Sequence, residues 1–242
     1  MEEGGYWWSL RAERPGRSER RPAYRPPSSR ALIAVWRRCF KGELHFACLP
    51  RATPRPGTSR PPSARPYLVR DFPVLSAGPT PRTPLTDWTF SITGEVDKLK
   101  NWTWDEFRKL PTETLTQDIH CVTKWSKLDT VWEGVSIDTL LDGVDTSAEY
   151  VMAFSDGGYT TNLPLEDVTG GKAWVAINFD GAPLGAEHGG PARLLVPHLY
   201  FWKSAKWVRG LQLMAKDEPG FWETYGYHMY GEPWREQRYS GD

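Results

Sequence analysis

Cys121 is the residue of this chain from which we start, because its thiol could serve in catalysis, in metal binding or in the core. It stands in the run Asp118-Ile119-His120-Cys121-Val122-Thr123-Lys124-Trp125-Ser126, and no other cysteine follows residue 48. A thiolate can act as a nucleophile or as a soft metal ligand. A nucleophile needs a base, and the adjacent His120 would point to the opposite face of a strand. A metal ligand needs only nearby positive charge. A buried structural thiol needs neither a base nor a charge, so the roles of metal ligand and of structural thiol both stay open for Cys121.

Two later segments combine glycine with basic side chains. They are His188-Gly189-Gly190-Pro191-Ala192-Arg193 and Lys203-Ser204-Ala205-Lys206-Trp207. Paired glycines let the backbone approach a ligand closely, and the planar fork of Arg193 matches a phosphate or the edge of a pterin. The two lysines are point charges suited to the same anion. The alternative is a solvated basic loop without a ligand.

A third segment, Gly226 to Trp234, is rich in aromatic residues and follows Trp222 and Tyr225. Such a cluster can line a binding site, and it can equally fill a hydrophobic core.

Hydrophobic periodicity predicts the elements that position these segments. Trp88, Phe90 and Ile92 alternate with polar residues before a turn at Gly94, and 115–123 alternates so that Ile119 and Cys121 share one face. Further strands are expected at 150–154, 173–179, 193–196 and 207–214, a tight turn at 156–159, a helical turn at 165–168, and short helices after Thr103 and Ser136. Short strands with few short helices predict an α+β fold with mixed, mostly antiparallel sheets.

Charge divides the chain into two parts. Residues 1–66 hold 14 Lys and Arg against 5 Asp and Glu, whereas residues 67–242 hold 16 against 25. The first part is rich in arginine and proline, so we predict a disordered extension over 1–66, or one translated from a start that the native protein does not use, and a single domain over 67–242. A basic nucleic-acid arm is the alternative for this extension; we expect no nucleic-acid partner.

No segment has the anatomy of an export signal or a membrane span. The apolar run of residues 31–36 is too short to cross a bilayer, and the arginine pairs at 20–21 and 37–38 precede no proper hydrophobic stretch. Three cysteines make an odd number without a disulfide framework, which is typical of a reducing compartment. We therefore expect a bacterial cytoplasmic protein, and export by a twin-arginine signal is the alternative.

Taken together, residues 118–126, 188–197, 201–208 and 226–234 resemble the sulfite-oxidase-like, molybdopterin-dependent oxidoreductase family. The resemblance covers residues 67–242. It implies the molybdopterin-binding fold of that family, a molybdenum-molybdopterin cofactor, and oxygen-atom transfer to or from a small heteroatom substrate of the sulfoxide or sulfite type. It also implies that electrons pass to or from a separate redox protein of the haem or flavin type.

The resemblance assigns roles to individual residues. Cys121 matches the cysteine that binds molybdenum and is the catalytic ligand. The cofactor-binding positions are matched by Arg70, Asp71, His120, Asp156, His188, Arg193, Lys203, Ser204, Ala205 and Lys206.

The chain departs from true sulfite oxidases directly after Cys121. Those enzymes continue with Ala-Gly-Asn-Arg-Arg, where the arginines help to bind an anionic substrate, whereas residues 122–126 here contain no arginine. Sulfite is therefore not the expected substrate, and the resemblance is closer to the catalytic subunit of methionine-sulfoxide reductases. The dimerisation and haem domains of animal sulfite oxidases have no counterpart in 67–242, so we expect a monomer.

Thirteen tryptophans leave a second function open. A β-rich module could use aromatic faces to bind carbohydrate or peptide without any redox chemistry.

We predict that removing residues 1–66 leaves the melting temperature and the activity of the remaining chain nearly unchanged, because this segment has too little apolar surface to contribute to a core. Thermal unfolding and turnover of the full-length and truncated chains test this. A large loss of either quantity would place the domain boundary before residue 67.

Overall fold

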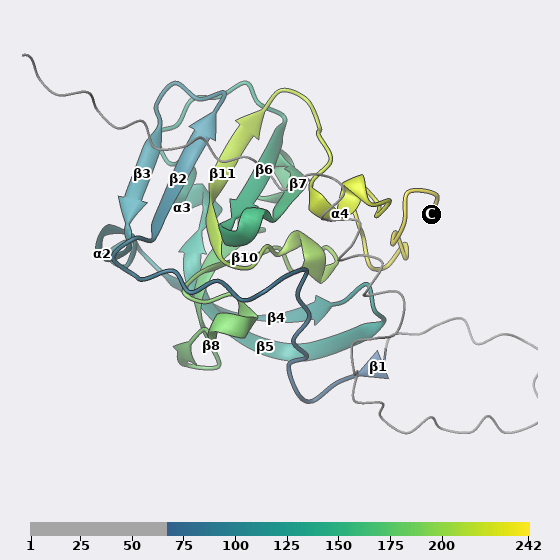
Figure 1. Ribbon diagram of the computed structural model, residues 1–242. Coiled ribbons are helices and arrows are strands. Elements are labelled where there is room, and N and C mark those ends of the chain that lie inside the picture. The colour runs from purple at the N-terminus through teal and green to yellow at the C-terminus, as the bar shows by residue number, and fades with distance from the viewer. Residues whose placement is uncertain (1–66) are drawn as a thin grey trace, which may run out of the picture. The chain divides into compact units, whose positions relative to one another are not determined.

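The computed structural model describes residues 67–242. The predicted extension, the two arginine pairs, Cys39 and Cys48 lie outside the described residues. Two β-sheets and a few short helices make up the described part (Figure 1).

The first sheet has five strands in the order β3 (Lys100–Thr103), β2 (Thr89–Gly94), β11 (Val208–Met214), β6 (Tyr150–Ser155) and β7 (Thr160–Pro164). Figure 1 shows them side by side in this order. Only β2 and β11 are parallel, and the other neighbours are antiparallel.

The second sheet is built on β5 (Trp125–Ser136), which pairs with β1 (Tyr67–Leu68), β4 (Glu113–His120) and β8 (Trp174–Phe179). The strand β8 also pairs with β9 (Ala182–Pro183) and β10 (Arg193–Leu195). Here β1 and β5 are parallel, and the remaining pairs are antiparallel. The two sheets confirm the predicted α+β class with mostly antiparallel pairing.

The helices are short, as predicted. They are α2 (Trp104–Phe107), α3 (Ile137–Leu141) and α4 (Phe221–Thr224), with 3-10 turns η1 (Asp156–Gly158), η2 (Leu165–Asp167), η3 (Ala186–His188) and η4 (Phe201–Lys203). The predicted capping box is present, because Thr103 Oγ1 accepts from the amide of Glu106 and Glu106 accepts from the amide of Thr103 at 2.8 Å. Ser136 is the N-cap of α3. No helix within 67–242 has the length and apolarity that a bilayer crossing requires.

The second sheet is buried on both faces. Along β8, Val175 and Ile177 join the larger core shared with the first sheet, while Ala176 joins a smaller cluster on the opposite face. Burial on both faces explains why residues 173–179 read as an almost continuous apolar run. The smaller cluster contains Cys121, so the thiol lies on the side of the second sheet that faces away from the main core.

Most of the tryptophans in the described residues are structural. Six of them are buried, namely Trp88, Trp125, Trp132, Trp174, Trp202 and Trp207. Side chains in these positions build cores and do not offer a stacking platform for a sugar or peptide, which argues against the aromatic binding module. Trp234 differs, since 78% of it is exposed.

A buried ion pair connects η4 with α4. Lys203 Nζ lies 2.6 Å from Glu223 Oε1, and both side chains are fully buried. Lys203 also donates to the carbonyl and side-chain oxygens of Asn162 and to the carbonyl of Met229. The pair thus joins η4, β7, α4 and the segment after α4.

We predict that Lys203→Met lowers the free energy of unfolding by about 3–5 kcal/mol, because it leaves the carboxylate of Glu223 buried without its partner. Urea unfolding measures this. The matched control is Lys98→Met, since Lys98 lies 3.7 Å from Asp97 and is 73% exposed, and we expect it to cost less than about 1 kcal/mol. Equal costs for the two variants would refute a special role for the buried pair.

Candidate functional site

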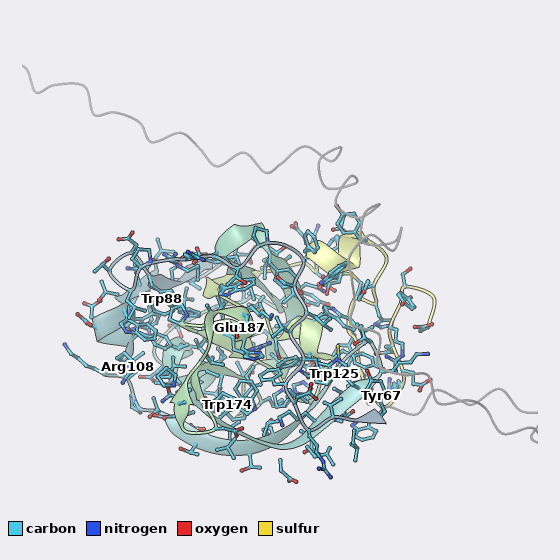
Figure 2. All side chains as sticks on the ribbon, turned by 60° about the horizontal axis from the view of Figure 1, so that its bottom comes forward. Tyr67, Trp88, Arg108, Trp125, Trp174 and Glu187 are labelled. Atoms are coloured by element: carbon cyan, nitrogen blue, oxygen red, sulfur yellow. The ribbon has the colours of Figure 1, made fainter. Side chains whose placement is uncertain are left out.

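Cys121 is the first residue of a tight turn between β4 and β5. Its amide donates to the carbonyl of Trp125 at 2.8 Å, and its own carbonyl accepts from the amide of Lys124 at 3.0 Å. Lys124 has a φ of 74°, which closes the turn. The strand β1 runs beside this turn and pairs Tyr67 with Trp125, and Figure 2 shows these two residues close together. The hairpin therefore fixes the thiol at the end of the second sheet.

The thiol is buried, with 7% of the residue exposed, and its sulfur lies 3.1 Å from Thr123 Oγ1. Burial raises the pKa of Cys121, while hydrogen bonds within the turn to Thr123 and the charge of Arg238 act in the opposite direction. A buried thiol of raised pKa is a poor nucleophile by itself. A metal ion binds it by displacing the proton, and the positive charge of the ion stabilises the thiolate.

His120 is directed away from the thiol. Its Nδ1 lies 2.8 Å from Ser126 Oγ, and its ring meets the exposed ring of Trp234 edge-on with centroids 5.1 Å apart. Burial lowers the pKa of His120, and the charge of Asp118 partly opposes this. His120 is thus hydrogen-bonded to Ser126 and not to Cys121, so it does not serve the thiol as a base.

Arg193 is the centre of the basic segment. The residue is 1% exposed, its Nη1 donates to the carbonyl of His188 at 2.7 Å, and its Nη2 donates to the carbonyl of Ser204 at 2.8 Å. Its guanidinium carbon lies 4.0 Å from the centroid of the Phe201 ring. Burial lowers the pKa of Arg193 to about 9, so the side chain is a cation at neutral pH. One buried cation therefore joins the two basic segments that the sequence singled out.

The glycine pair allows a close backbone approach. Gly189 has a φ of 106°, and a Cβ there would lie 3.0 Å from Cβ of Lys206 and 3.1 Å from Cβ of Arg193. At Gly190, a Cβ would lie 2.1 Å from the carbonyl oxygen of Leu184. A side chain at Gly189 would therefore press on Arg193 and Lys206, and one at Gly190 would clash with the backbone of Leu184.

Lys206 completes the group of cations. Its ammonium donates to the carbonyls of Leu75 (2.8 Å) and Glu187. Burial, and after it the charge of Arg193, lower the pKa of Lys206 to about 8. Burial and the charge of Lys206 also lower the pKa of His188. His188, Arg193 and Lys206 thus lie within electrostatic range of one another, which makes the loop a place where an anion is stabilised.

Aromatic rings connect this loop with the thiol. The ring of Phe72 stacks on that of His188 with centroids 4.2 Å apart and planes 15° apart, and it also contacts Phe201. Phe201 in turn contacts Trp125, the last residue of the Cys121 turn, at 6.3 Å. Phe72 thus covers one face of the His188 ring.

The remaining predicted site residues differ in their surroundings. Ser204 Oγ accepts from the amide of Val196, and the carbonyl of Ala205 accepts from the amide of Leu194, so both hold the basic segment against β10. Arg70 and Asp71 are exposed and follow β1 next to the Cys121 turn.

Two predicted ligands have full sets of partners within the chain. Asp156 is paired with Arg209 at 2.9 Å and accepts from Thr83 at 2.6 Å. The ammonium of Lys203 has four oxygen acceptors in its buried pair with Glu223, so a cofactor would compete with them.

Three side chains near the thiol were not predicted as site residues. Arg238 donates to the carbonyl of Val122. Burial raises the pKa of Tyr200 and of Tyr227, and the thiol adds a smaller contribution in the same direction to each. Tyr227 falls in the aromatic segment noted in the sequence. The sequence around Tyr200 and Arg238 does not indicate a role near Cys121, because both residues are far from it in the chain and only the tertiary fold brings them to the Cys121 turn.

Comparison with known proteins gives a family match. The family model described as "Oxidoreductase molybdopterin binding domain" matches residues 77–222. "Uncharacterized oxidoreductase YuiH" of Bacillus subtilis is 43% identical over 178 residues, which are 72% of this chain and 90% of that protein.

Other relatives are longer than the part that this chain matches. "Putative protein-methionine-sulfoxide reductase subunit YedZ1" of Azospira oryzae is 30% identical over 58% of this chain and 54% of its own length. "Protein-methionine-sulfoxide reductase catalytic subunit MsrP" of Pseudomonas syringae is 27% identical over 66% and 52%. Among solved structures, the "Sulfane Dehydrogenase SoxCD from Paracoccus pantotrophus" superposes with a TM-score of 0.52 at 24% identity, covering 57% of this chain and 40% of that one, which supports the fold.

We predict that the burial of Lys206 makes stability depend on pH. The pKa of Lys206 is lowered in the folded chain, so unfolding takes up a proton between about pH 8 and pH 10, and the cost of the buried charge disappears as the pH rises through this window. The free energy of unfolding of the wild type, measured relative to that of Lys206→Met, should rise by about 1 kcal/mol from pH 7 to pH 9.5. This value allows for partial screening of the charge by solvent. Urea unfolding at both pH values measures this, and a difference between the two proteins that does not change with pH would contradict it.

Proposed function

The chain belongs to the family of oxidoreductases with a molybdopterin-binding domain, and on that premise we propose that Cys121 is the protein ligand of a molybdenum-molybdopterin cofactor that transfers an oxygen atom to or from a small sulfur-type substrate. One observation carries the proposal. The buried thiol and the loop of cations around Arg193 border the same aromatic cluster, on the face of the second sheet opposite the main core.

The donor set fits such a cofactor. His188 Nδ1, Arg193 Nε and the Tyr200 hydroxyl are buried and have no hydrogen-bond partner within residues 67–242. Buried polar groups without partners are costly, so their grouping around one cluster supports a polar ligand there. A pterin offers a flat ring with hydrogen-bonding edges, and its phosphate is an anion.

We propose a separate role for each residue that the sequence predicted to bind the cofactor. Arg193 and Lys206 would hold the phosphate, and His188 would contact the pterin. Ser204 and Ala205 present the basic segment from the edge of β10. Arg70 and Asp71 approach from β1, and His120, Asp156 and Lys203 stabilise the surrounding elements through the bonds that they already make.

The bound cofactor supplies two-electron oxygen-atom transfer at the metal. The chain contributes a thiolate from a rigid hairpin, keeps it in a largely buried cluster where water is excluded, and orients the cofactor through the cations of the second loop. Protein-methionine-sulfoxide reductase subunits among the relatives support a sulfoxide or a related sulfur compound as the substrate class.

We further propose that the protein acts as a cytoplasmic monomer that exchanges electrons with a separate redox protein. The relatives named as subunits support a division of labour between a catalytic chain and a partner. Size-exclusion chromatography and cell fractionation test the monomer and its location.

We predict that Cys121→Ser loses most of its molybdenum and at least about 100-fold in turnover, because even the groups that merely orient a metal ligand change affinity by about 10–100-fold when removed. The protein is produced in a host that makes the cofactor, and molybdenum is measured by elemental analysis alongside turnover with a sulfoxide. The matched control is the same chemical change at Cys48, which should alter neither quantity. Absence of molybdenum from the wild type, or full retention by Cys121→Ser, would refute the proposed ligand.

A further inference from the structure

Trp234 is the most exposed large apolar side chain in residues 67–242. Its exposed fraction is 78%, against 73% for the next, Leu99. Single exposed apolar residues are common on protein surfaces, so the importance of this ring depends on what surrounds it.

The indole ring borders an open cavity of about 610 Å³. Further walls come from the end of β4, from Trp174 at the start of β8, and from Pro197 and His198. The two indole rings and the proline form an apolar centre, and polar side chains surround it. An exposed aromatic ring beside such a hollow is typical of a surface that another protein contacts.

The polar groups of this cavity already have partners within the chain. Asp118 Oδ1 accepts from the amide of Asp129 at 2.9 Å, and His198 Nε2 lies 3.2 Å from Asp167 Oδ1. Within residues 67–242, no group of three or more His, Cys, Asp or Glu side chains is arranged to hold a metal ion. The cavity is therefore better suited to the surface of a protein than to a metal ion or a small polar ligand.

The same ring is also close to the Cys121 turn. Trp234 meets the ring of His120 edge-on with centroids 5.1 Å apart, and His120 directly precedes Cys121 in the chain. His120 itself is buried, so Trp234 lies between it and solvent. Electron exchange between two proteins weakens steeply with the distance between their redox centres. A redox partner that contacts Trp234 would be separated from the thiol by two side chains and one peptide unit.

Acidic groups predominate around this surface. The cavity lining contains two carboxylates and one lysine, Lys172. Beside Trp234 the charge of Arg235 is offset by Glu232 at 2.9 Å, and Glu236 is exposed. Residues 67–242 as a whole hold 25 acidic against 16 basic side chains. An apolar centre with an acidic rim complements a protein whose own apolar contact surface has a basic rim.

We propose that Trp234 and the adjacent cavity are the docking site for the redox protein that exchanges electrons with the cofactor, and that this partner carries a basic rim around an exposed haem edge. The inference rests on the proposed function, because Cys121 is taken as the metal ligand. The contact is expected to be small and transient, as in other electron-transfer encounters.

The reaction balances with such a partner as the reductant. Reduction of one sulfoxide to the thioether takes up two electrons and two protons and releases one water. Two haem irons supply the electrons, each passing from the ferrous to the ferric state, and the protons come from solvent.

The test uses the molybdenum-loaded full chain with dimethyl sulfoxide as the oxidant and two alternative electron donors, a reduced basic cytochrome c of low potential and reduced benzyl viologen. Trp234→Ala should lower the second-order rate constant for oxidation of the cytochrome about 10-fold or more, since a central aromatic residue contributes much of the binding energy of an interface. Turnover with the small dye should change less than about 2-fold, because the dye needs no docking surface. The matched control is Leu99→Ala, a similarly exposed apolar residue next to β3, which should change neither rate by more than about 2-fold.

Ionic strength gives the second readout. The rate with the cytochrome should fall as salt is added, and Asp118→Asn, which keeps the oxygen that accepts from Asp129, should lower it about 2–5-fold at low salt and little at high salt. A reduced flavodoxin, which is acidic, should react more slowly than the cytochrome and should react faster as salt is added.

Three results would overturn the docking site while leaving the proposed function intact. They are Trp234→Ala with wild-type molybdenum content and an unchanged rate with the cytochrome, an equal loss of rate with the dye, and a rate with the cytochrome that rises with salt. Wild type without molybdenum would instead overturn the proposed function. If Trp234→Ala fails to fold, Asp118→Asn and the salt dependence decide.

Discussion

The buried guanidinium of Arg193 is the interaction on which the arrangement of the site depends. Its two hydrogen bonds reach the carbonyls of His188 and Ser204, which belong to separate loops on either side of β10. Because Arg193 is fully buried, these carbonyls and the Phe201 ring replace the water that a cation would otherwise have. The glycines at 189 and 190 then allow the backbone to close around it. A lysine would offer one ammonium nitrogen and not the planar fork whose two nitrogens each reach a different carbonyl here.

The two-sided burial of the second sheet explains why the thiol and Arg193 lie on the same face of that sheet. One face of β8 and β10 completes the main core, so these strands have a fixed register, as Val175 and Leu194 show. The opposite face carries Ala176 and Leu195 and borders Cys121. Packing in the main core thereby fixes where the side chains of β8 and β10 lie on the opposite face, which borders Cys121. Side chains on that face can change without removing the support beneath them.

Many of the strands, the helix starts and the basic segments could be predicted from the sequence, because local patterns determine them. Alternation predicted β2 and the strand that ends before Cys121, and the capping residues Thr103 and Ser136 predicted where α2 and α3 begin. The basic segments were recognised by composition, and the fold brings them together through Arg193. The boundary of β4 was less accurate, since the strand ends at His120 and the turn begins at Cys121 itself.

The roles of some side chains could not be predicted from the sequence, because they depend on contacts between residues far apart in the chain. Lys203 has the residue type of an anion ligand, yet its ammonium is held by Glu223, Asn162 and Met229. No local spacing distinguishes such a lysine from one that faces a ligand.

The converse holds for Arg238. It stands in a polar C-terminal segment that has no periodicity, and only the closure of that segment over Val122 brings its charge to the thiol. Burial raises the free energy of a thiolate at Cys121, and a nearby cation lowers it again. Among the described residues, Arg238 supplies positive charge to the buried thiol from outside the thiol's own turn.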